Sequence, residues 1–179
     1  MKLLVLALVA VALLVGAFGA KCTTIRKDLV AERQAIDADW ARVDAALLDR
    51  ASIVPELTNL LQSEAPAEGG TILRVNDARN LLSAAHTQQE KIQANARLDE
   101  ALSRLILLVE FHPKLEGSKK YGDLLEALKG AEYRIAVARR QYNEAVEHYN
   151  ARIDLFPNNI VASLTRLGKI DAYFQTPAI

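Results

Sequence analysis

The sequence predicts an all-α protein, with an N-terminal transmembrane helix followed by an elongated antiparallel bundle of three long helices and a short C-terminal helix. A run from Leu3 to Ala20 contains no charged residue. Apolar residues then recur at helical spacing in three long stretches, and no alternating run of useful length indicates a strand. Ala and Leu supply most of the apolar mass, and aromatic residues make up only 6% of the chain, a composition that favours helices over sheets. We therefore expect an anchor at 1–21, a helical bundle at 22–167 and a C-terminal tail at 168–179.

The run at 3–20 has about the length that a helix needs to cross the apolar part of a bilayer. Its length exceeds the apolar part of a usual cleaved leader, which is about 7–15 residues. Phe18 also occupies a position where signal cleavage at Ala20 would require a small residue. These features favour an uncleaved signal anchor whose partner is the lipid bilayer, and a cleaved leader is the alternative.

Cys22 is the only cysteine, so no intramolecular disulfide is expected. A lipid-modified cysteine requires a small residue directly before it, and Lys21 stands there instead. A free thiol near the membrane surface is therefore favoured over lipidation.

The first helical stretch is expected from Asp28 to Leu61. No Pro or Gly separates Lys21 from Asp28, so the helix can continue directly from the membrane segment. Pro55 predicts a kink, because it removes one backbone hydrogen bond. Arg33 and Arg50 interrupt the apolar seam. The seam has two rows of heptad-spaced residues, Ile36, Val43 and Leu57 in one row and Trp40, Leu47, Val54 and Leu61 in the other.

The second stretch is expected from Ile72 to Phe111, after a break at Glu64–Gly70 that contains Pro66 and two glycines. Its apolar rows change phase near Ala96–Leu98, which resembles a coiled-coil stutter within one helix. Pro113 is expected to end this helix.

The third stretch is expected from Lys119 to Leu155, with Ser118 as N-cap. A short helix should follow at Ile160–Leu167 and end at Gly168. Short connections predict antiparallel neighbours. The third stretch carries the most regular row of the chain, in which every seventh residue is large and apolar or aromatic: Tyr121, Leu128, Ile135, Tyr142, Tyr149 and Phe156.

Several segments resemble the LemA family of bacterial membrane proteins. They are Glu110–Leu115 (EFHPKL), Tyr121–Leu125 (YGDLL), Glu132–Asn150 with its two Tyr-Asn pairs, Phe156-Pro157, and Ile53–Leu57 (IVPEL) after Trp40. Glu56 and His112 depart from the family pattern. The resemblance implies one N-terminal membrane segment, a long helical bundle and a poorly defined biochemical role. It also implies a set of structural motif residues: Trp40, Asp44, Pro55, Glu132, Arg139, Tyr142, Asn143, Tyr149, Asn150, Phe156 and Pro157.

No pattern in the sequence indicates catalysis, a cofactor or a metal. His86, His112 and His148 fall in different segments, and no metal-binding or phosphate-binding motif includes them. Glu144 and His148 share a helix face, but the second such pair that a di-iron bundle needs is absent, so both are expected to be solvent-exposed. The chain has 22 basic and 22 acidic residues, which gives no electrostatic reason to expect nucleic acid as a partner.

The pairs Tyr142-Asn143 and Tyr149-Asn150 allow two interpretations. The tyrosines lie on the core row, and an asparagine beside that row can fix helix register by hydrogen bonds, which is the favoured role. The alternative is that the pairs line a peptide groove. Trp40 and Phe156 are expected in the core, whereas Asp44, Arg50, Glu132 and Arg139 are expected to pair across the seam or be solvated at its edge.

An anchor joined to a helical rod without catalytic motifs predicts a membrane-tethered, non-enzymatic scaffold or adaptor that engages other membrane or envelope proteins. The alternative is a peptide- or lipid-binding module, because the Ala-rich first half of the second stretch packs weakly and leaves room for a groove. We expect a single-pass protein of the bacterial inner membrane. The charges that flank the anchor favour a cytoplasmic bundle, but lipoprotein-like members of the family favour the periplasm, which we expect. A helical seam also allows a homo-oligomer.

Overall fold

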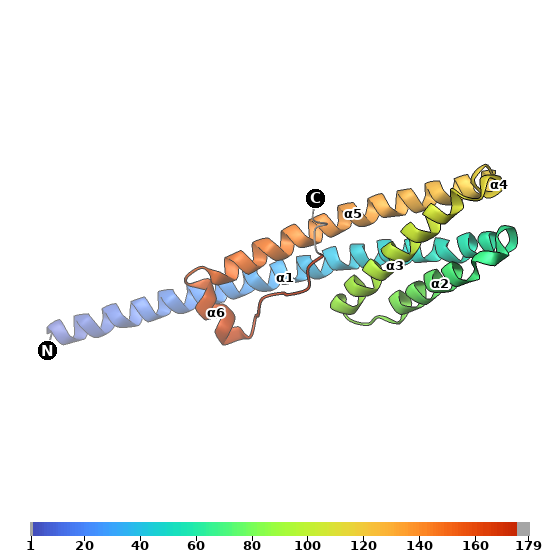
Figure 1. Ribbon diagram of the computed structural model, residues 1–179. Helices are drawn as coiled ribbons and strands as arrows, with labels where there is room; N and C mark the ends of the chain where they lie inside the picture. The colour runs from blue at the N-terminus through green and yellow to red at the C-terminus, as the bar shows by residue number, and fades with distance from the viewer. Residues whose placement is uncertain (1, 175–179) are drawn as a thin grey trace. The chain divides into compact units, whose positions relative to one another are not determined.

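The computed structural model describes residues 2–174, with side chains at Leu13 and from Gly16 onward (Figure 1). All regular elements of this part are helices, which confirms the all-α fold. In chain order they are α1 (Lys2–Glu64), the 3₁₀ helix η1 (Pro66–Glu68), α2 (Gly69–Ala84), α3 (Gln88–Val109), α4 (Pro113–Glu116), α5 (Lys119–Asp154) and α6 (Asn158–Thr165).

Helix α1 is continuous from Lys2 to Glu64 and passes through Pro55, so the expected continuity with the N-terminal segment is confirmed. In the residues searched for membrane spans, which are those that the structure describes, no helix is both long and apolar enough to cross a bilayer. Most side chains of the predicted anchor at 3–20, those of residues 3–12, 14 and 15, lie outside the described ones. Cys22 is a free, half-buried thiol.

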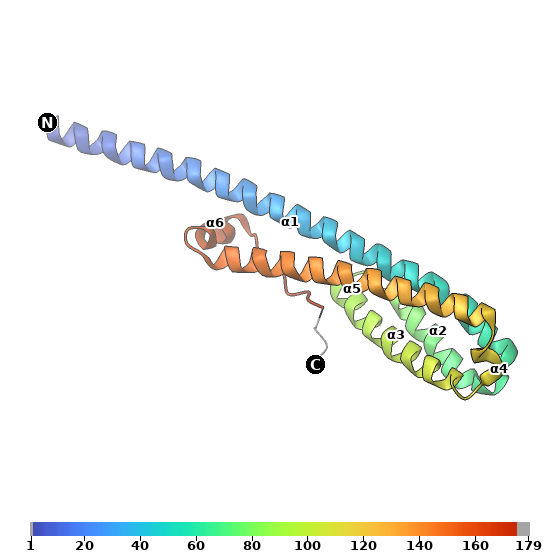
Figure 2. The ribbon, with the colours of Figure 1, turned by 90° about the horizontal axis from the view of Figure 1, so that it is seen from above.

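The prediction of one long second helix is wrong, because residues 69–109 form two helices. Helices α2 and α3 are joined at residues 85–87 and lie side by side in both ribbon views (Figures 1 and 2). Among the described residues, four longer helices, α1, α2, α3 and α5, thus replace the three that were expected before the short C-terminal helix. Helix α3 runs without a break through Ala96–Leu98, and Ala96, which the predicted row placed in the seam, is exposed.

A capping box explains why α3 begins at Gln88. The hydroxyl oxygen of Thr87 accepts a hydrogen bond from the Glu90 backbone N–H at 3.2 Å. The Glu90 carboxylate in turn accepts from the backbone N–H groups of His86 and Thr87, at 2.9 and 3.0 Å. These bonds satisfy donors that a continuous helix would have paired with its own carbonyls. They also lower the pKa of Glu90, because they stabilise its carboxylate form.

The other helix ends agree with the sequence to within a few residues. Ser118 accepts a hydrogen bond from the Tyr121 backbone N–H at 3.2 Å, as a residue that caps the start of α5 should. At the end of α6 the expected glycine terminator is wrong, because Arg166, and not Gly168, takes the left-handed conformation, with φ of 58°.

The chain divides into two compact units. Unit 1 consists of Met1–Ala38 and Glu144–Asp171, and unit 2 consists of Asp39–Asn143 and Ala172–Ile179. Helices α1 and α5 each contribute to both units.

In unit 2 the helices alternate in direction. Asp49 and Glu56 of α1 form ion pairs with Arg134 and Lys120 of α5 respectively, so these two segments run antiparallel. Asp44 and Arg50 of α1 instead meet successively later residues of α3, which makes α1 and α3 parallel. With α2 antiparallel to α3, unit 2 is an up-down-up-down four-helix arrangement.

The predicted seams form the core. Leu47, Val54, Leu61, Ile135 and Tyr142 are fully buried. Phe156 lies outside the core, because α5 ends at Asp154 and the row cannot continue past that residue, and Trp40 is only half-buried. The prediction that Phe156 is a core residue is wrong, since 75% of it is exposed.

In unit 1, Arg152 of α5 forms ion pairs with Asp28 and Glu32 of α1, one helical turn apart. Leu29 and Tyr149 are fully buried in the same unit. The charged pairs thus lie beside an apolar core, as expected for charges near a helix seam.

Candidate peptide-binding site

The segment after α6 has no regular secondary structure from Leu167 to Phe174 (Figure 1). Two of its apolar side chains are nevertheless buried, since Ile170 is 8% exposed and Phe174 is 4% exposed. Burial of an irregular segment requires partners for its backbone groups. Those partners come from side chains of α5 and α1.

In unit 2, the Phe174 ring lies among three side chains, which together with Asn143 we call the Phe174 cage. Trp40 of α1 stacks on the ring, with centroids 6.0 Å apart and planes at 23°. Tyr142 of α5 meets the ring edge-on, at 6.2 Å and 86°. The guanidinium of Arg139 lies 4.7 Å from the ring centroid, within the range of a cation–π contact. Trp40 and Tyr142 also contact each other at 5.2 Å.

Asn143 binds the backbone of the same residue. Its amide nitrogen donates to the Phe174 carbonyl oxygen at 2.8 Å, and its amide oxygen accepts from the Phe174 N–H at 3.1 Å. The Tyr142 hydroxyl donates to the carbonyl oxygen of Ala172 at 2.9 Å. Adjacent residues of α5 therefore bind the ring and the main chain of one short segment.

In unit 1, Asn150 forms the same pair of bonds with Ile170. Its amide nitrogen donates to the Ile170 carbonyl oxygen at 2.8 Å, and its oxygen accepts from the Ile170 N–H at 2.9 Å. Arg33 donates to the carbonyl oxygen of Gly168 at 3.2 Å, and Lys169 forms an ion pair with Asp154 at 2.8 Å. Both predicted Tyr-Asn pairs thus contribute an asparagine that binds an irregular backbone rather than another helix.

A second polar cluster in unit 2 surrounds Arg50, which is 1% exposed. Its guanidinium donates to Glu132 at 2.7 Å and also to Asp99 and Asn95. A buried guanidinium requires such partners, because an unpaired buried charge is strongly destabilising. Burial raises the pKa of Asp99, and the charge of Arg50 opposes this rise.

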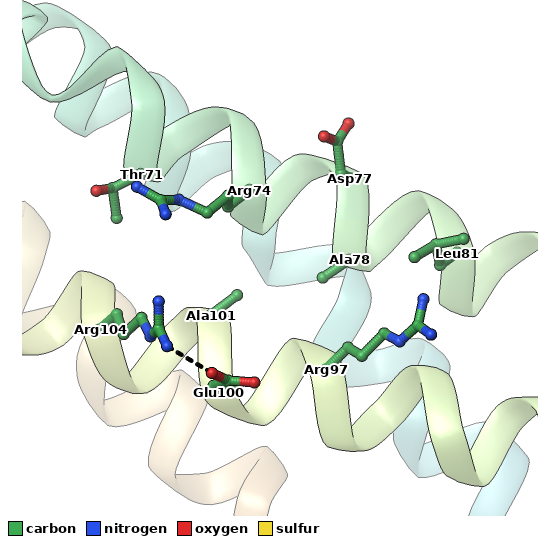
Figure 3. Close-up of a pocket in the computed structure, with 9 residues that line it drawn as sticks. All are labelled: Thr71, Arg74, Asp77, Ala78, Leu81, Arg97, Glu100, Ala101 and Arg104. Atoms are coloured by element: carbon green, nitrogen blue, oxygen red, sulfur yellow. Dashed lines mark hydrogen bonds and ion pairs between the residues drawn. The ribbon is translucent and has the colours of Figure 1, made fainter.

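A third feature of unit 2 is a cleft of about 260 Å³ between α2 and α3 (Figure 3). Figure 3 shows Ala78 and Ala101 facing each other between the two helices. Small side chains at both positions leave the space open. The remaining residues that line the cleft are mainly charged or polar, with Leu81 as the large apolar one: Thr71, Arg74, Asp77, Leu81, Arg97, Glu100 and Arg104.

The structure brings four of the predicted motif residues together in the Phe174 cage: Trp40, Arg139, Tyr142 and Asn143. The others are distributed along the helices. Glu132 pairs with Arg50, Asp44 forms an ion pair with Lys91, and Pro55 lies within α1. Pro157 precedes the first residue of α6.

Sequence reasoning missed Ile170 and Phe174, because they lie in the predicted tail and belong to no helical row. The one local indication was the aromatic pair Tyr173-Phe174 in the predicted tail. Glu144 and His148 are both exposed, as expected. Among the described residues, no group of three His, Cys, Asp or Glu side chains is arranged to hold a metal ion.

Comparison with known proteins identifies the family of the chain. The model of the LemA family matches residues 39–178. Magnetosome protein MamQ 2 of Paramagnetospirillum magneticum is 32% identical over 85 residues, which cover 48% of this chain and 31% of that protein. Magnetosome protein MamQ of Magnetospirillum gryphiswaldense is 28% identical over a region of the same length and coverage. The aligned region spans about a third of the length of these relatives. The family match covers most of the present chain, so the chain belongs to the LemA family.

Proposed function

We propose that the protein is a membrane-tethered, non-enzymatic helical adaptor that engages other membrane or envelope proteins. The observation that carries this proposal is the continuity of α1 from Lys2 to Glu64. One helix contains the apolar run at 3–20 and also supplies Trp40 and Arg50 to unit 2. A protein bound to unit 2 would therefore be joined to the proposed membrane segment through this chain.

An exposed apolar surface in unit 2 supports the proposal. Tyr133 and Val137 of α5, one helical turn apart, are 72% and 41% exposed. A shallow cleft of about 550 Å³ lies between α1 and α5 beside Tyr133 and Val137. Exposed apolar side chains beside a cleft are typical of protein-binding surfaces.

The proposal also includes the cellular location of the protein. We place the chain in the bacterial inner membrane as a single-pass protein, with the helical units on the periplasmic side. The MamQ relatives come from bacteria, which is consistent with this assignment.

Site-specific crosslinking in cells tests the adaptor proposal. A photo-crosslinking amino acid at Tyr133, in the exposed apolar surface, should give discrete products with envelope proteins in repeated experiments. The matched control is the same amino acid at Glu147, an exposed position of α5 outside that surface. An absence of products from Tyr133, or identical products from both positions, would contradict the proposal.

A second candidate function, a peptide- or lipid-binding module, is favoured by the cleft between α2 and α3. Its apolar floor and its three arginines, Arg74, Arg97 and Arg104, suit an amphiphile with an acidic group. Arg97→Glu should then weaken binding of the full chain to acidic peptides or to vesicles with anionic lipid. Unchanged binding to both probes would remove this candidate.

A further inference from the structure

We infer that the Phe174 cage is a binding site for an extended peptide segment that carries a phenylalanine, and that residues 172–174 of this chain occupy it as an internal ligand that such a segment of a partner displaces. The inference rests on the proposed adaptor function, because it names how the adaptor would hold a partner. It concerns unit 2 alone.

The backbone contacts are those of peptide recognition. Asn143 bonds to both the N–H and the C=O of Phe174, so it recognises main-chain groups that every extended segment presents. The Tyr142 hydroxyl donates a hydrogen bond to a second main-chain carbonyl, that of Ala172. Affinity from main-chain bonds combined with a pocket for one side chain is a recurring mode of peptide binding.

The ring contacts supply the specificity. Stacking by Trp40, the edge-on contact of Tyr142 and the cation–π contact of Arg139 each require an aromatic ring at this position. An aliphatic side chain would fill part of the space but make none of these contacts. The occupant is therefore a segment with a phenylalanine and not a general apolar chain.

The internal occupant is held by side-chain contacts and not by secondary structure. Residues 172–174 belong to no helix, and the hydrogen bonds of Ala172 and Phe174 go to the side chains of Tyr142 and Asn143 rather than to a helical ladder. Their departure leaves the backbone hydrogen bonds of α1 and α5 intact, so it requires only local opening. The segment therefore acts as a competitor that a partner must displace.

Trp40 is the only tryptophan of the chain, so its fluorescence reports on the cage. The experiment uses the full chain in detergent and an end-blocked peptide with the sequence of residues 169–174, which contains no tryptophan. Phe174→Pro opens the cage, because it removes both the ring and the N–H that Asn143 binds. Phe111→Ala, at a phenylalanine that is 82% exposed, is the control for loss of a ring elsewhere.

We expect the Phe174→Pro variant to bind the peptide with a saturable change in Trp40 emission. Wild type and the Phe111→Ala control should bind at least about tenfold more weakly, because their internal segment competes. A peptide with alanine in place of the phenylalanine, or the added substitution Asn143→Ala, should weaken binding by roughly tenfold or more.

Three results would overturn the inference: no saturable response of a Phe174→Pro variant that circular dichroism shows to be helical, equal binding of the alanine peptide, or unchanged binding after Asn143→Ala. Crosslinks from Tyr133 are measured independently of the peptide. The cage inference can therefore fail while the adaptor function stands, and the reverse holds as well.

Discussion

Asn143 and Phe174 are joined by two hydrogen bonds, one in each direction, between a helical side chain and the main chain of an irregular segment. Asn143→Ala removes both bonds and should cost about 1–3 kcal/mol of the free energy that holds the segment in place. The expected result is faster hydrogen exchange at the Phe174 amide and a red shift of Trp40 emission.

Asn150→Ala is the matched control for that variant, because Asn150 forms the same pair of bonds with Ile170 in unit 1. It should accelerate exchange at the Ile170 amide. A shift of Trp40 emission as large as that of Asn143→Ala would show that the two asparagines do not act locally.

Arg50→Met tests the buried polar cluster. The substitution leaves Asn95, Asp99 and Glu132 without their shared donor, and should lower the free energy of unfolding by about 1–3 kcal/mol because the Asn95 amide is buried. Urea denaturation followed by circular dichroism measures this loss. Arg134→Met, which removes an ion pair whose side chains are about half exposed, should cost less than about 1 kcal/mol. Equal losses of stability in the two variants would contradict the claim that the buried Arg50 cluster contributes more than an exposed ion pair.

Asp99 predicts a pH dependence of stability. Burial raises its pKa in the folded state, so the proton binds more tightly to the folded chain than to the unfolded one. Its contribution is therefore fully present below the unfolded pKa, about 3.9 for Asp, and is lost as the pH rises through the folded pKa.

Asp99→Asn removes this dependence. The stability of wild type relative to the variant should fall as the pH rises from about 3.9 through that window. Urea midpoints measured across the range check the direction. A relative stability that grows with pH would mean that the attraction of Arg50 outweighs the burial of the carboxyl.

Thr87→Ala tests the start of α3. The loss of the hydroxyl acceptor for the Glu90 N–H should destabilise the protein by about 1 kcal/mol. Hydrogen exchange should accelerate in the first turn of α3. Ser83→Ala is the control, since Ser83 lies exposed within α2 and donates only to its own helix. A similar acceleration in both variants would argue against the cap.

The helical rows were predictable because burial follows the period of the helix. The row from Tyr121 to Tyr149 is buried throughout, as its spacing predicted. The break between α2 and α3 was missed although Thr87 and Glu90 have the spacing of a capping box. The apolar rows on either side of this break were regular enough to indicate one helix.

The candidate site was predictable only on its helical side. Trp40, Arg139, Tyr142 and Asn143 could be named from the family resemblance, but their common contact could not. Phe174 belongs to an irregular segment whose position depends on hydrogen bonds to side chains distant in sequence. Such bonds leave no regular spacing in the sequence. The sequence therefore suggested a peptide groove at the Tyr-Asn pairs but not that residues 172–174 would fill it.

Membrane topology tests whether the N-terminal part of α1 tethers the chain to the membrane. A reporter active only outside the cytoplasm is fused after Ile179, the mass of the full chain is measured, and membranes are washed at alkaline pH. We expect a chain that retains residues 1–20, stays in the membrane after the wash and carries an active reporter. A chain that has lost residues 1–20 and is released by the wash would contradict this expectation.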